Sequence, residues 1–392
     1  MSLDINIVVL GGCGFLGQHV VAELLTEKER LTKEPRNGTE KGEKPWSIQG
    51  IKVLDVKAHN EDLLTAQRQD AQCVTYETCD IRDFGDLKEK LRGASVVVNC
   101  AVVSPNFLKE DLGCGEHMRR VNVEGTKNIV KACQELGVLA LVHTSSTCVK
   151  MGGKRLIEHT ESLSPEVSED DLVLGDYARG RLEAERVVLE ASGTVSPNGT
   201  KLRTIALRPP IIYGEGDTSF VPLIYTLAKT AGNKLPSIGS PGAFTQAAYA
   251  GNVAVAYARA INHLLTDEGR SELHTCNGLP VYITDDTPPN NLVDLASPFL
   301  EHAHLQPSSR DSYWAISLSL YWADLVDGLK TRMGLTAGGQ GQALPIWTLH
   351  QFARTISVVS RMRAELCLGY SPAYSWEQSL KRSNLYYSRY LN

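Results

Sequence analysis

Short apolar runs, rich in β-branched residues, alternate with helical patterns through the first half of the chain. The runs that predict strands are residues 5–10, 51–54, 95–99, 140–144 and 204–207. Between them, apolar residues recur at helical spacing over residues 84–92, 123–136 and 177–191. Strands that are apolar throughout are typical of a parallel sheet covered on both faces. The pattern therefore predicts an α/β fold with a doubly wound parallel sheet.

The regular alternation ends near residue 208, which divides the chain into two expected parts. Residues 1–208 form the predicted sheet domain, in which the charged, turn-rich stretch 27–50 is expected to be an exposed, mobile insertion. Residues 209–392 hold glycine- and proline-punctuated helical patterns, and we expect mainly a smaller C-terminal lobe that binds the substrate. Residues 244–283 are expected to pack back on the sheet domain.

Composition and charge indicate which kinds of molecule this protein is expected to bind. The 392 residues are 42% hydrophobic with a formal net charge of −5, which gives no overall positive field for nucleic acid. Nine cysteines without paired C-x-x-C spacing predict reduced thiols and no metal site. The N-terminus lacks the features of a signal peptide, and the apolar stretch 313–323 is shorter than the ~20 residues that span a bilayer. We therefore expect a cytoplasmic protein with a small-molecule partner.

A glycine motif follows the first predicted strand. Gly11, Gly14 and Gly17 have G-x-x-G-x-x-G spacing, and a helical pattern opens there with Phe15 and Leu16. Glycines permit a tight turn and a close approach of backbone amides to a pyrophosphate, whose charge the helix N-terminus attracts. The pattern alone is also typical of an ordinary turn, but its place between strand and helix favours a dinucleotide site in a Rossmann-type domain.

Two acidic residues bear on which dinucleotide binds. Asp55 ends the second predicted strand, where a carboxylate accepts hydrogen bonds from ribose hydroxyls and repels a 2′-phosphate, so NAD is favoured over NADP. A turn-capping role for Asp55, and partial neutralisation by Lys57, are the alternatives. Asp80 either contacts the adenine amine, with Ile81 beside it, or caps the helix predicted at 84–92.

Three residues in the middle of the chain suggest proton transfer. Tyr177 and Arg181 are four apart at the start of a helical pattern, so they share one face. A phenol has a pKa near 10, and a cation beside it favours the phenolate needed for proton transfer at neutral pH. Ser146 follows the strand predicted at 140–144, at the edge where ligands of parallel sheets bind, and its hydroxyl could hold a substrate oxygen.

In this order along the chain, these segments resemble the extended short-chain dehydrogenases, and most closely the 3β-hydroxysteroid dehydrogenase/isomerase group. The resemblance covers nearly the whole chain. Its matching segments are VVLGGCGFLG (8–17), the strand end at Asp55, VNVEGTKNIV (121–130), HTSSTCV (143–149), YARGRLEAE (177–185), ALRPPIIYGEG (206–216), YAGNVAVAYARA (249–260) and LGYSPAYSWEQSL (368–380).

The resemblance implies catalytic roles for Ser146, Tyr177 and Arg181, and a supporting role for Asn122 at the active-site helix. It implies that residues 209–214 line the nicotinamide and substrate pocket. In this family a hydride passes between C3 of a sterol-like alcohol and the nicotinamide, and some members then isomerise the neighbouring double bond. The expected cofactor contacts are Gly11, Gly14, Phe15, Leu16, Gly17, Asp55, Asp80, Ile81, Ala101, Tyr177, Arg181 and Pro209.

The chain departs from the family pattern at three positions. Arg181 stands where the family's Y-x-x-x-K has lysine, and the two cations are not interchangeable at a close-fitting site. Val102 occupies a position that is usually small, and Leu10 one that is often a hydroxyl residue. Other residues are expected to be structural rather than catalytic, namely His143, Tyr249, Asn252, Trp314, Tyr321 and Trp322.

Three functions remain open at this stage. The leading hypothesis is NAD-dependent oxidation of a 3β-hydroxyl of a small, apolar, sterol-like substrate, with Tyr177 as acid/base. A second enzymatic hypothesis is another extended short-chain dehydrogenase, such as a sugar-nucleotide epimerase or a ketone reductase. The third is a catalytically weak NAD-binding sensor or scaffold, because of Arg181 and Val102. At most peripheral contact with the endoplasmic reticulum membrane is expected, and a homodimer is left open.

Overall fold

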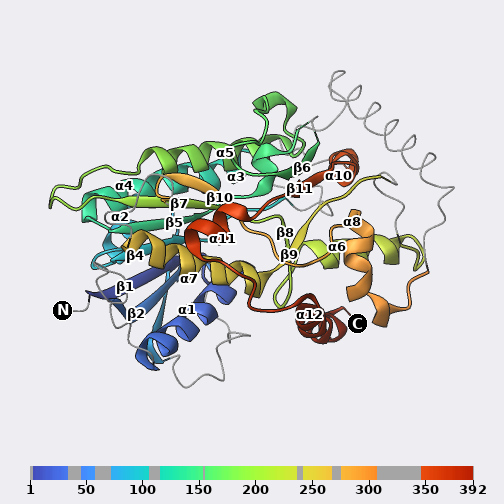
Figure 1. The fold of residues 1–392 in the computed structure, drawn as a ribbon, viewed down its shortest axis with the longest axis horizontal. Coiled ribbons are helices and arrows are strands. Elements are labelled where there is room, and N and C mark those ends of the chain that lie inside the picture. Colours follow the sequence, from blue (N-terminus) through green and yellow to red (C-terminus); the bar gives the residue numbers. More distant parts are fainter. Residues whose placement is uncertain are drawn as a thin grey trace.

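A seven-stranded parallel sheet forms the centre of the computed structural model (Figure 1), with the order β10-β7-β5-β4-β1-β2-β3. The structure describes residues 3–33, 46–57, 72–105, 115–152, 155–235, 242–266, 275–306 and 346–391. The strands of this sheet are β1 (Leu3–Leu10), β2 (Trp46–Asp55), β3 (Val74–Thr78), β4 (Val96–Asn99), β5 (Ala140–Thr144), β7 (Arg203–Arg208) and β10 (Leu279–Tyr282). Every pairing between neighbouring strands is parallel, so the predicted doubly wound fold is confirmed.

Helices cover both faces of this sheet, each through its own apolar core. On one face, α1 (Phe15–Lys33), α7 (Ala250–Thr266) and α11 (Met362–Leu368) pack against alternate strand residues such as Val9 and Val142. On the other face lie α2 (Phe84–Lys90), α4 (Thr126–Leu136) and α5 (Gly175–Glu190), against residues such as Val8 and Leu141. The alternation along each strand explains why the strands read as continuous apolar runs.

The expected exposed insertion at 27–50 is wrong at both of its ends. Helix α1 continues through Lys33, and Leu31 in this part is buried. Strand β2 begins at Trp46, and both Trp46 and Ile48 are buried beside the first face of the sheet. In the described part of this stretch, Glu29 and Lys33 are exposed positions of an amphipathic helix, while Glu27 is buried and paired with Arg30. The many charged residues concealed the helical period of α1. Residues 34–45 lie outside the described residues.

Two elements from the second half of the chain join the main sheet and its cover. Strand β10 pairs with β7 at the edge of the sheet, with Leu279 opposite Ile205. Helix α7 packs against α1 through the same apolar core. Residues 279–282 therefore extend the sheet itself, although no strand was predicted there.

A second, smaller core lies beside the sheet. It gathers α6 (Phe220–Thr230), α8 (Leu292–Ala296), α10 (Ile346–Ala353), α12 (Trp376–Tyr390) and the paired strands β8 (Ile211–Tyr213) and β9 (Ala247–Tyr249). The buried aromatic residues of this core are Tyr213, Phe220, Tyr249, Phe299 and Tyr387. Elsewhere, β6 (Leu156–His159) pairs with β11 (Ser357–Val359). Short elements are α3 (Gly115–Arg119), a π-helical turn (Arg120–Gly125) and 3-10 turns at Thr147–Lys150, Glu169–Asp171, Ser297–Phe299 and Glu301–Ala303.

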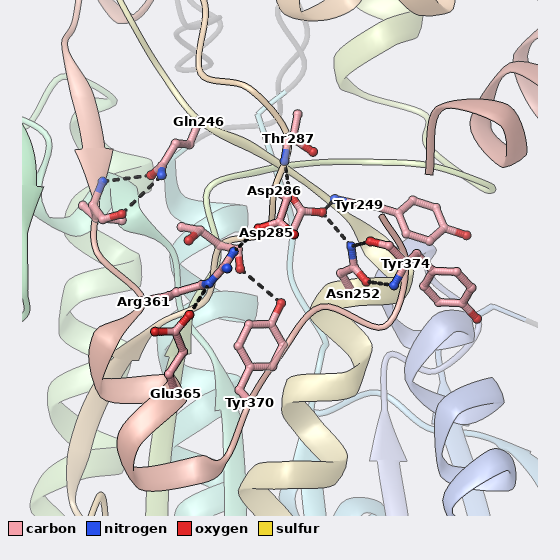
Figure 2. Close-up of polar contacts among 12 residues, drawn as sticks. Gln246, Tyr249, Asn252, Asp285, Asp286, Thr287, Arg361, Glu365, Tyr370 and Tyr374 are labelled. Carbon is pink, nitrogen blue, oxygen red and sulfur yellow. Dashed lines mark hydrogen bonds and ion pairs between the residues drawn. The ribbon is translucent and has the colours of Figure 1, made fainter. Parts of the chain in front are cut away.

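Polar contacts fasten the C-terminal segment to the rest of the molecule (Figure 2). Asp285 accepts hydrogen bonds from the Tyr249 amide at 2.8 Å and from the Asn252 side chain at 2.9 Å. Asn252 in turn exchanges two 2.9 Å hydrogen bonds with the backbone of Tyr374. Arg361 bridges Asp286 and Glu365 beside them. The amide groups of Asn252 are thus used by the fold, as expected for a structural residue.

Within the part of the chain that the structure describes, no helix is both long and apolar enough to cross a membrane. The aromatic residues Trp314, Tyr321 and Trp322 lie outside the described residues.

Candidate functional site

The glycine turn between β1 and α1 leaves no room for side chains. Gly11 has a φ of +72°, and a Cβ placed on it would lie 2.6 Å from the backbone of Ala101. A Cβ on Gly17 would collide with the carbonyl oxygen of Gly11. The turn is closed by a 3.1 Å hydrogen bond from the Gly14 amide to the Gly11 carbonyl, directly before α1 begins at Phe15. This geometry places the N-terminus of α1 where backbone amides can meet a phosphate.

The two residues that open α1 have different surroundings. The Phe15 ring meets the His19 ring edge-on and lies beside Gly216. The side chain of Leu16 packs against the apolar core that α1 and α7 share, so its backbone is the part of the residue that remains for the turn. The expected contact of Leu16 with a cofactor is therefore one that its backbone amide would make.

Asp55 lies at the end of β2 and is held next to the glycine turn. Its carboxylate accepts a hydrogen bond from the Cys13 amide at 3.0 Å and another from the Lys57 amide at 3.0 Å. The residue is 8% exposed. Its position at the strand end beside the turn is the one that a carboxylate needs to reach a ribose hydroxyl.

Asp80 does not cap the following helix, which corrects one of its two expected roles. Asp83 is the N-cap of α2, where its side chain accepts hydrogen bonds from the Gly85 and Asp86 amides. Asp80 is held by Arg82, whose guanidinium approaches to 2.6 Å and keeps the pKa of the carboxyl below its usual range. The carboxylate therefore stays ionised next to a cation.

Ile81 and Ala101 are held by different neighbours, Ile81 beside Gly125 and Ala101 beside Gly11. Ile81 is buried, and its side chain fills the space beside Gly125 so closely that a Cβ there would lie 2.5 Å away. The Ala101 amide donates to the Asn99 side chain at 3.1 Å, which fixes the backbone against Gly11. Both residues thus lie next to elements of the glycine turn or of the helix that follows β4.

The two serines after β5 have different environments. Ser145 is buried, and its hydroxyl donates to Glu185 Oε2 at 2.6 Å. Ser146 is partly exposed, and its hydroxyl oxygen accepts a hydrogen bond from the Cys148 amide at 3.2 Å. That contact uses Ser146 as an acceptor, and the Ser146 hydroxyl also forms a hydrogen bond with the Cys148 thiol. The environment supports Ser146 rather than Ser145 as the residue that meets a substrate.

Tyr177 and Arg181 lie at the start of α5, as predicted. Arg181 is 2% exposed and donates to the carbonyl oxygen of Thr144, at the end of β5. Among the described residues, its Nε has no hydrogen-bond partner. Burial raises the pKa of Tyr177, while the positive charge of Arg181 and the Ser104 hydroxyl act in the opposite direction. The expected effect of the cation on the phenol is present, but burial outweighs it.

Asn122 supports the segment after β4 through its side-chain amide. It lies in the π-helical turn before α4, which is a type of distortion frequent at functional sites. Its side chain accepts from the Val103 amide at 2.8 Å and donates to the Val103 carbonyl at 2.9 Å. Of the other departures from the family pattern, Val102 is 37% exposed and Leu10 is fully buried in the core between α2 and α4.

Pro209 and His143 border the serine segment. The carbonyl of Pro209, just after β7, accepts the Thr147 amide at 3.0 Å. His143 is buried, and its Nδ1 lies 3.1 Å from the Asn99 amide nitrogen. Burial and the charge of Arg181 hold the pKa of His143 well below its usual range. The imidazole is therefore neutral, as expected for an interior histidine.

Glu185 and Arg208 were missed by the sequence analysis, although both lie directly behind Ser145. They form a buried ion pair with an N–O distance of 2.5 Å. The four-residue spacing from Tyr177 through Arg181 to Glu185 was the available signal. Among the described residues, no group of three or more histidine, cysteine, aspartate or glutamate side chains could hold a metal ion.

Solved structures with this fold align with nearly the whole chain. A dTDP-glucose 4,6-dehydratase from Streptomyces venezuelae, solved with NAD, aligns with a TM-score of 0.65 and 20% identity over 97% of this chain and 96% of its own. MoeE5, solved with UDP-glucuronic acid and NAD, aligns with a TM-score of 0.63 and 18% identity, over 98% and 99%. The likeness shows the class of fold alone.

Relatives in sequence point to one family within this class. A 3 beta-hydroxysteroid dehydrogenase/Delta 5-->4-isomerase of vaccinia virus (strain Copenhagen) is 26% identical over 96% of both chains. The 3 beta-hydroxysteroid dehydrogenase type 7 of Mus musculus is 28% identical over 96% of this chain and 94% of its own. A monkeypox virus relative is 30% identical over 63% of each chain, less than two thirds of its length.

The profile of the 3-beta hydroxysteroid dehydrogenase/isomerase family matches residues 8–314, so the chain belongs to this family. It is an NAD-dependent dehydrogenase of the short-chain type. The residues present fit this cofactor, since the turn at Gly11 and Gly17 is a cradle that a Cβ would fill, and Asp55 lies at its edge. When bound, NAD supplies the acceptor for a hydride.

Proposed function

We propose that this protein oxidises the 3β-hydroxyl of a sterol-like substrate, with Tyr177 as the acid/base and Ser146 as the group that holds the substrate oxygen. The observation that carries the proposal is the arrangement of α5 and β5. Helix α5 contacts β5 and the turn Thr147–Lys150 that follows it, and Tyr177 packs against the apolar cluster that contains Cys148 and Val149. Ser146, between the strand and this turn, has a partly exposed hydroxyl. Arg181 joins the two elements through the Thr144 carbonyl.

In the proposed reaction the side chains of the protein transfer one proton, that of the C3 hydroxyl. Ser146 donates a hydrogen bond to the alcohol oxygen, which orients the C3 hydroxyl toward Tyr177. Tyr177 as phenolate would remove the hydroxyl proton, and bound NAD would supply the acceptor for the C3 hydride. Burial raises the pKa of Tyr177, and the charge of Arg181, fixed one helical turn away, offsets part of the resulting cost of forming the phenolate. Asn122 holds Val103, and we propose that this keeps the neighbouring residues Ala101 and Val102 in place beside the cofactor.

The proposed cofactor contacts are those predicted from the sequence. The glycine turn and the N-terminus of α1 would hold the pyrophosphate, and Asp55 would accept hydrogen bonds from the adenosine ribose. We keep Asp80 and Ile81 near the adenine, and Pro209 near the nicotinamide, as proposals. The cytoplasmic location, the peripheral contact with the endoplasmic reticulum membrane and the homodimer also stay predictions.

The substrate class separates the two enzymatic hypotheses. Relatives named for 3β-hydroxysteroid chemistry match most of the chain, whereas the solved neighbours bind sugar nucleotides. The relatives share more identity with this chain than these neighbours do, and this supports the sterol proposal. The test is NADH formation by the purified protein, with pregnenolone as the 3β-hydroxysteroid and with UDP-glucose as the sugar nucleotide. Turnover with the steroid alone is expected, and turnover with only UDP-glucose would overturn the proposal.

The third hypothesis, a catalytically weak NAD sensor or scaffold, is motivated by Arg181. Its guanidinium donates to the Thr144 carbonyl, so this cation is engaged in a contact between α5 and the end of β5. Binding of NAD without turnover of any tested alcohol would favour this hypothesis.

A further inference from the structure

A buried ion pair lies directly behind the proposed serine–tyrosine pair. Arg208 on β7 donates through Nε to Glu185 Oε2 at 2.7 Å and through Nη2 to Oε1 at 2.5 Å. The side chains of Arg208 and Glu185 are only 4% and 2% exposed. A two-pronged contact of this kind fixes both the position and the orientation of the carboxylate.

The same carboxylate holds the residue before Ser146. Ser145 donates its hydroxyl proton to Glu185 Oε2 at 2.6 Å, inside the molecule. One oxygen of Glu185 thus accepts from both Ser145 and Arg208. The carboxylate therefore connects helix α5 with the end of β5.

Helix α5 holds two consecutive residues of this strand end. Tyr177, Arg181 and Glu185 follow one another at four-residue spacing, so they lie along one face of the helix. Arg181 donates to the carbonyl of Thr144, and Glu185 accepts from the hydroxyl of Ser145. The distance between Tyr177 and Ser146 is consequently set by two contacts made from the tyrosine's own helix.

Strand β7 fixes the same segment from the other side. The Ser145 amide donates to the Leu207 carbonyl at 2.7 Å, and the Thr147 amide donates to the Pro209 carbonyl at 3.0 Å. The backbone of Ser146 is therefore fixed on both sides by hydrogen bonds of its neighbours Ser145 and Thr147, and these bonds do not involve the Ser146 hydroxyl.

We propose that Glu185, oriented by Arg208, is a positioning residue for Ser146 and Tyr177. This inference rests on the proposed function, because it assigns no chemistry of its own to Glu185. A buried ion pair contributes little net stability compared with apolar residues of similar size, whereas a small displacement of reacting groups costs much of the rate. The Glu185–Arg208 pair is therefore expected to affect the placement of Ser146 and Tyr177 more than the free energy of unfolding.

The test removes the Ser145 contact and leaves the ion pair intact. In Ser145→Ala, kcat for pregnenolone oxidation falls about tenfold, while the KM for NAD and the Tm stay near the wild-type values. Ser145→Thr, which keeps the hydroxyl, recovers most of the rate. The matched control is Ser196→Ala, since Ser196 is also buried but donates to the Thr200 carbonyl in a turn after α5. A kcat within about twofold of wild type in Ser145→Ala would overturn the proposal.

A second readout needs no turnover. The Tyr177 signal in a protein labelled with ¹³Cζ-tyrosine is assigned by its loss in Tyr177→Phe, and its titration is followed by NMR. We expect its midpoint to move to higher pH in Ser145→Ala and to stay unchanged in Ser196→Ala, because the strand end that holds Arg181 is released. If the wild-type protein oxidises no steroid, the proposed function fails, and only the titration tests the role of Glu185. An unchanged Tyr177 midpoint in Ser145→Ala would then contradict the positioning role.

Discussion

The nucleotide end and the catalytic end of this site are built in opposite ways. At the nucleotide end, between Gly11 and Gly17, the geometry depends on the absence of side chains, because a Cβ would meet backbone atoms. At the catalytic end, buried side chains set the geometry: Arg181, Glu185 and Arg208 connect α5, β5 and β7. The glycines of the first end lie close together in the sequence, although Ala101 packs against Gly11 from after β4, and the second end depends on three segments coming together.

This difference predicts how each end responds to change. The geometry of a backbone turn is set by steric contacts, so a single added methyl group disrupts it. No substitution of such a glycine is therefore conservative. A network of buried charges is defined by hydrogen bonds, so it tolerates a change of side-chain shape poorly. Substitutions at the two ends should therefore affect different measurable quantities.

The largest effect is expected at the nucleotide end. In Gly17→Ala the new methyl group collides with the Gly11 carbonyl, so the turn must open and NAD affinity falls by about a hundredfold or more. Gly85→Ala is the control, because a Cβ there makes only an ordinary contact 3.5 Å from Asp83. Titration calorimetry with NAD measures both. Equal affinity in the two variants would show that the turn does not bind the cofactor.

A smaller effect is expected from the departure at the catalytic end. In Arg181→Lys the charge is kept, but the contact with the Thr144 carbonyl is weakened, so kcat for pregnenolone falls about tenfold while NAD affinity changes little. Steady-state rates and calorimetry on the same preparation give both values. A rise in kcat would mean that arginine suppresses catalysis here and would favour the sensor hypothesis.

The smallest expected effect is the dependence of the free energy of unfolding on pH. Burial and Arg181 hold the pKa of His143 below its unfolded value near 6.5, so below about pH 6.5 the unfolded chain binds a proton that the folded one does not. The free energy of unfolding therefore falls with decreasing pH, by up to about 1.4 kcal/mol per pH unit from this residue.

Urea unfolding at several pH values between about 5 and 7 measures this dependence. His143→Gln should flatten it, and the exposed His117→Gln should leave it unchanged. An identical slope in His143→Gln and wild type would show that the catalytic end does not carry this pH sensitivity.

The same contrast explains how much could be read from the sequence. The fold and the glycine turn follow from local patterns, namely apolar strand residues and glycines at fixed spacing. The Glu185–Arg208 pair joins residues 23 positions apart whose partners are set only by packing. The insertion at 27–50 was misjudged for a related reason, since Trp46 and Ile48 become buried only through contact with other elements. Local patterns therefore define the frame, and tertiary contacts define the catalytic end.

The central claim is that Tyr177 transfers the proton in an NAD-dependent oxidation of a 3β-hydroxysteroid. Its most direct test is the rate of NADH formation from pregnenolone in wild type and in Tyr177→Phe, with NAD affinity measured in both. We predict that Tyr177→Phe binds NAD as wild type does and loses about a thousandfold in kcat. An unchanged rate in Tyr177→Phe would contradict the account.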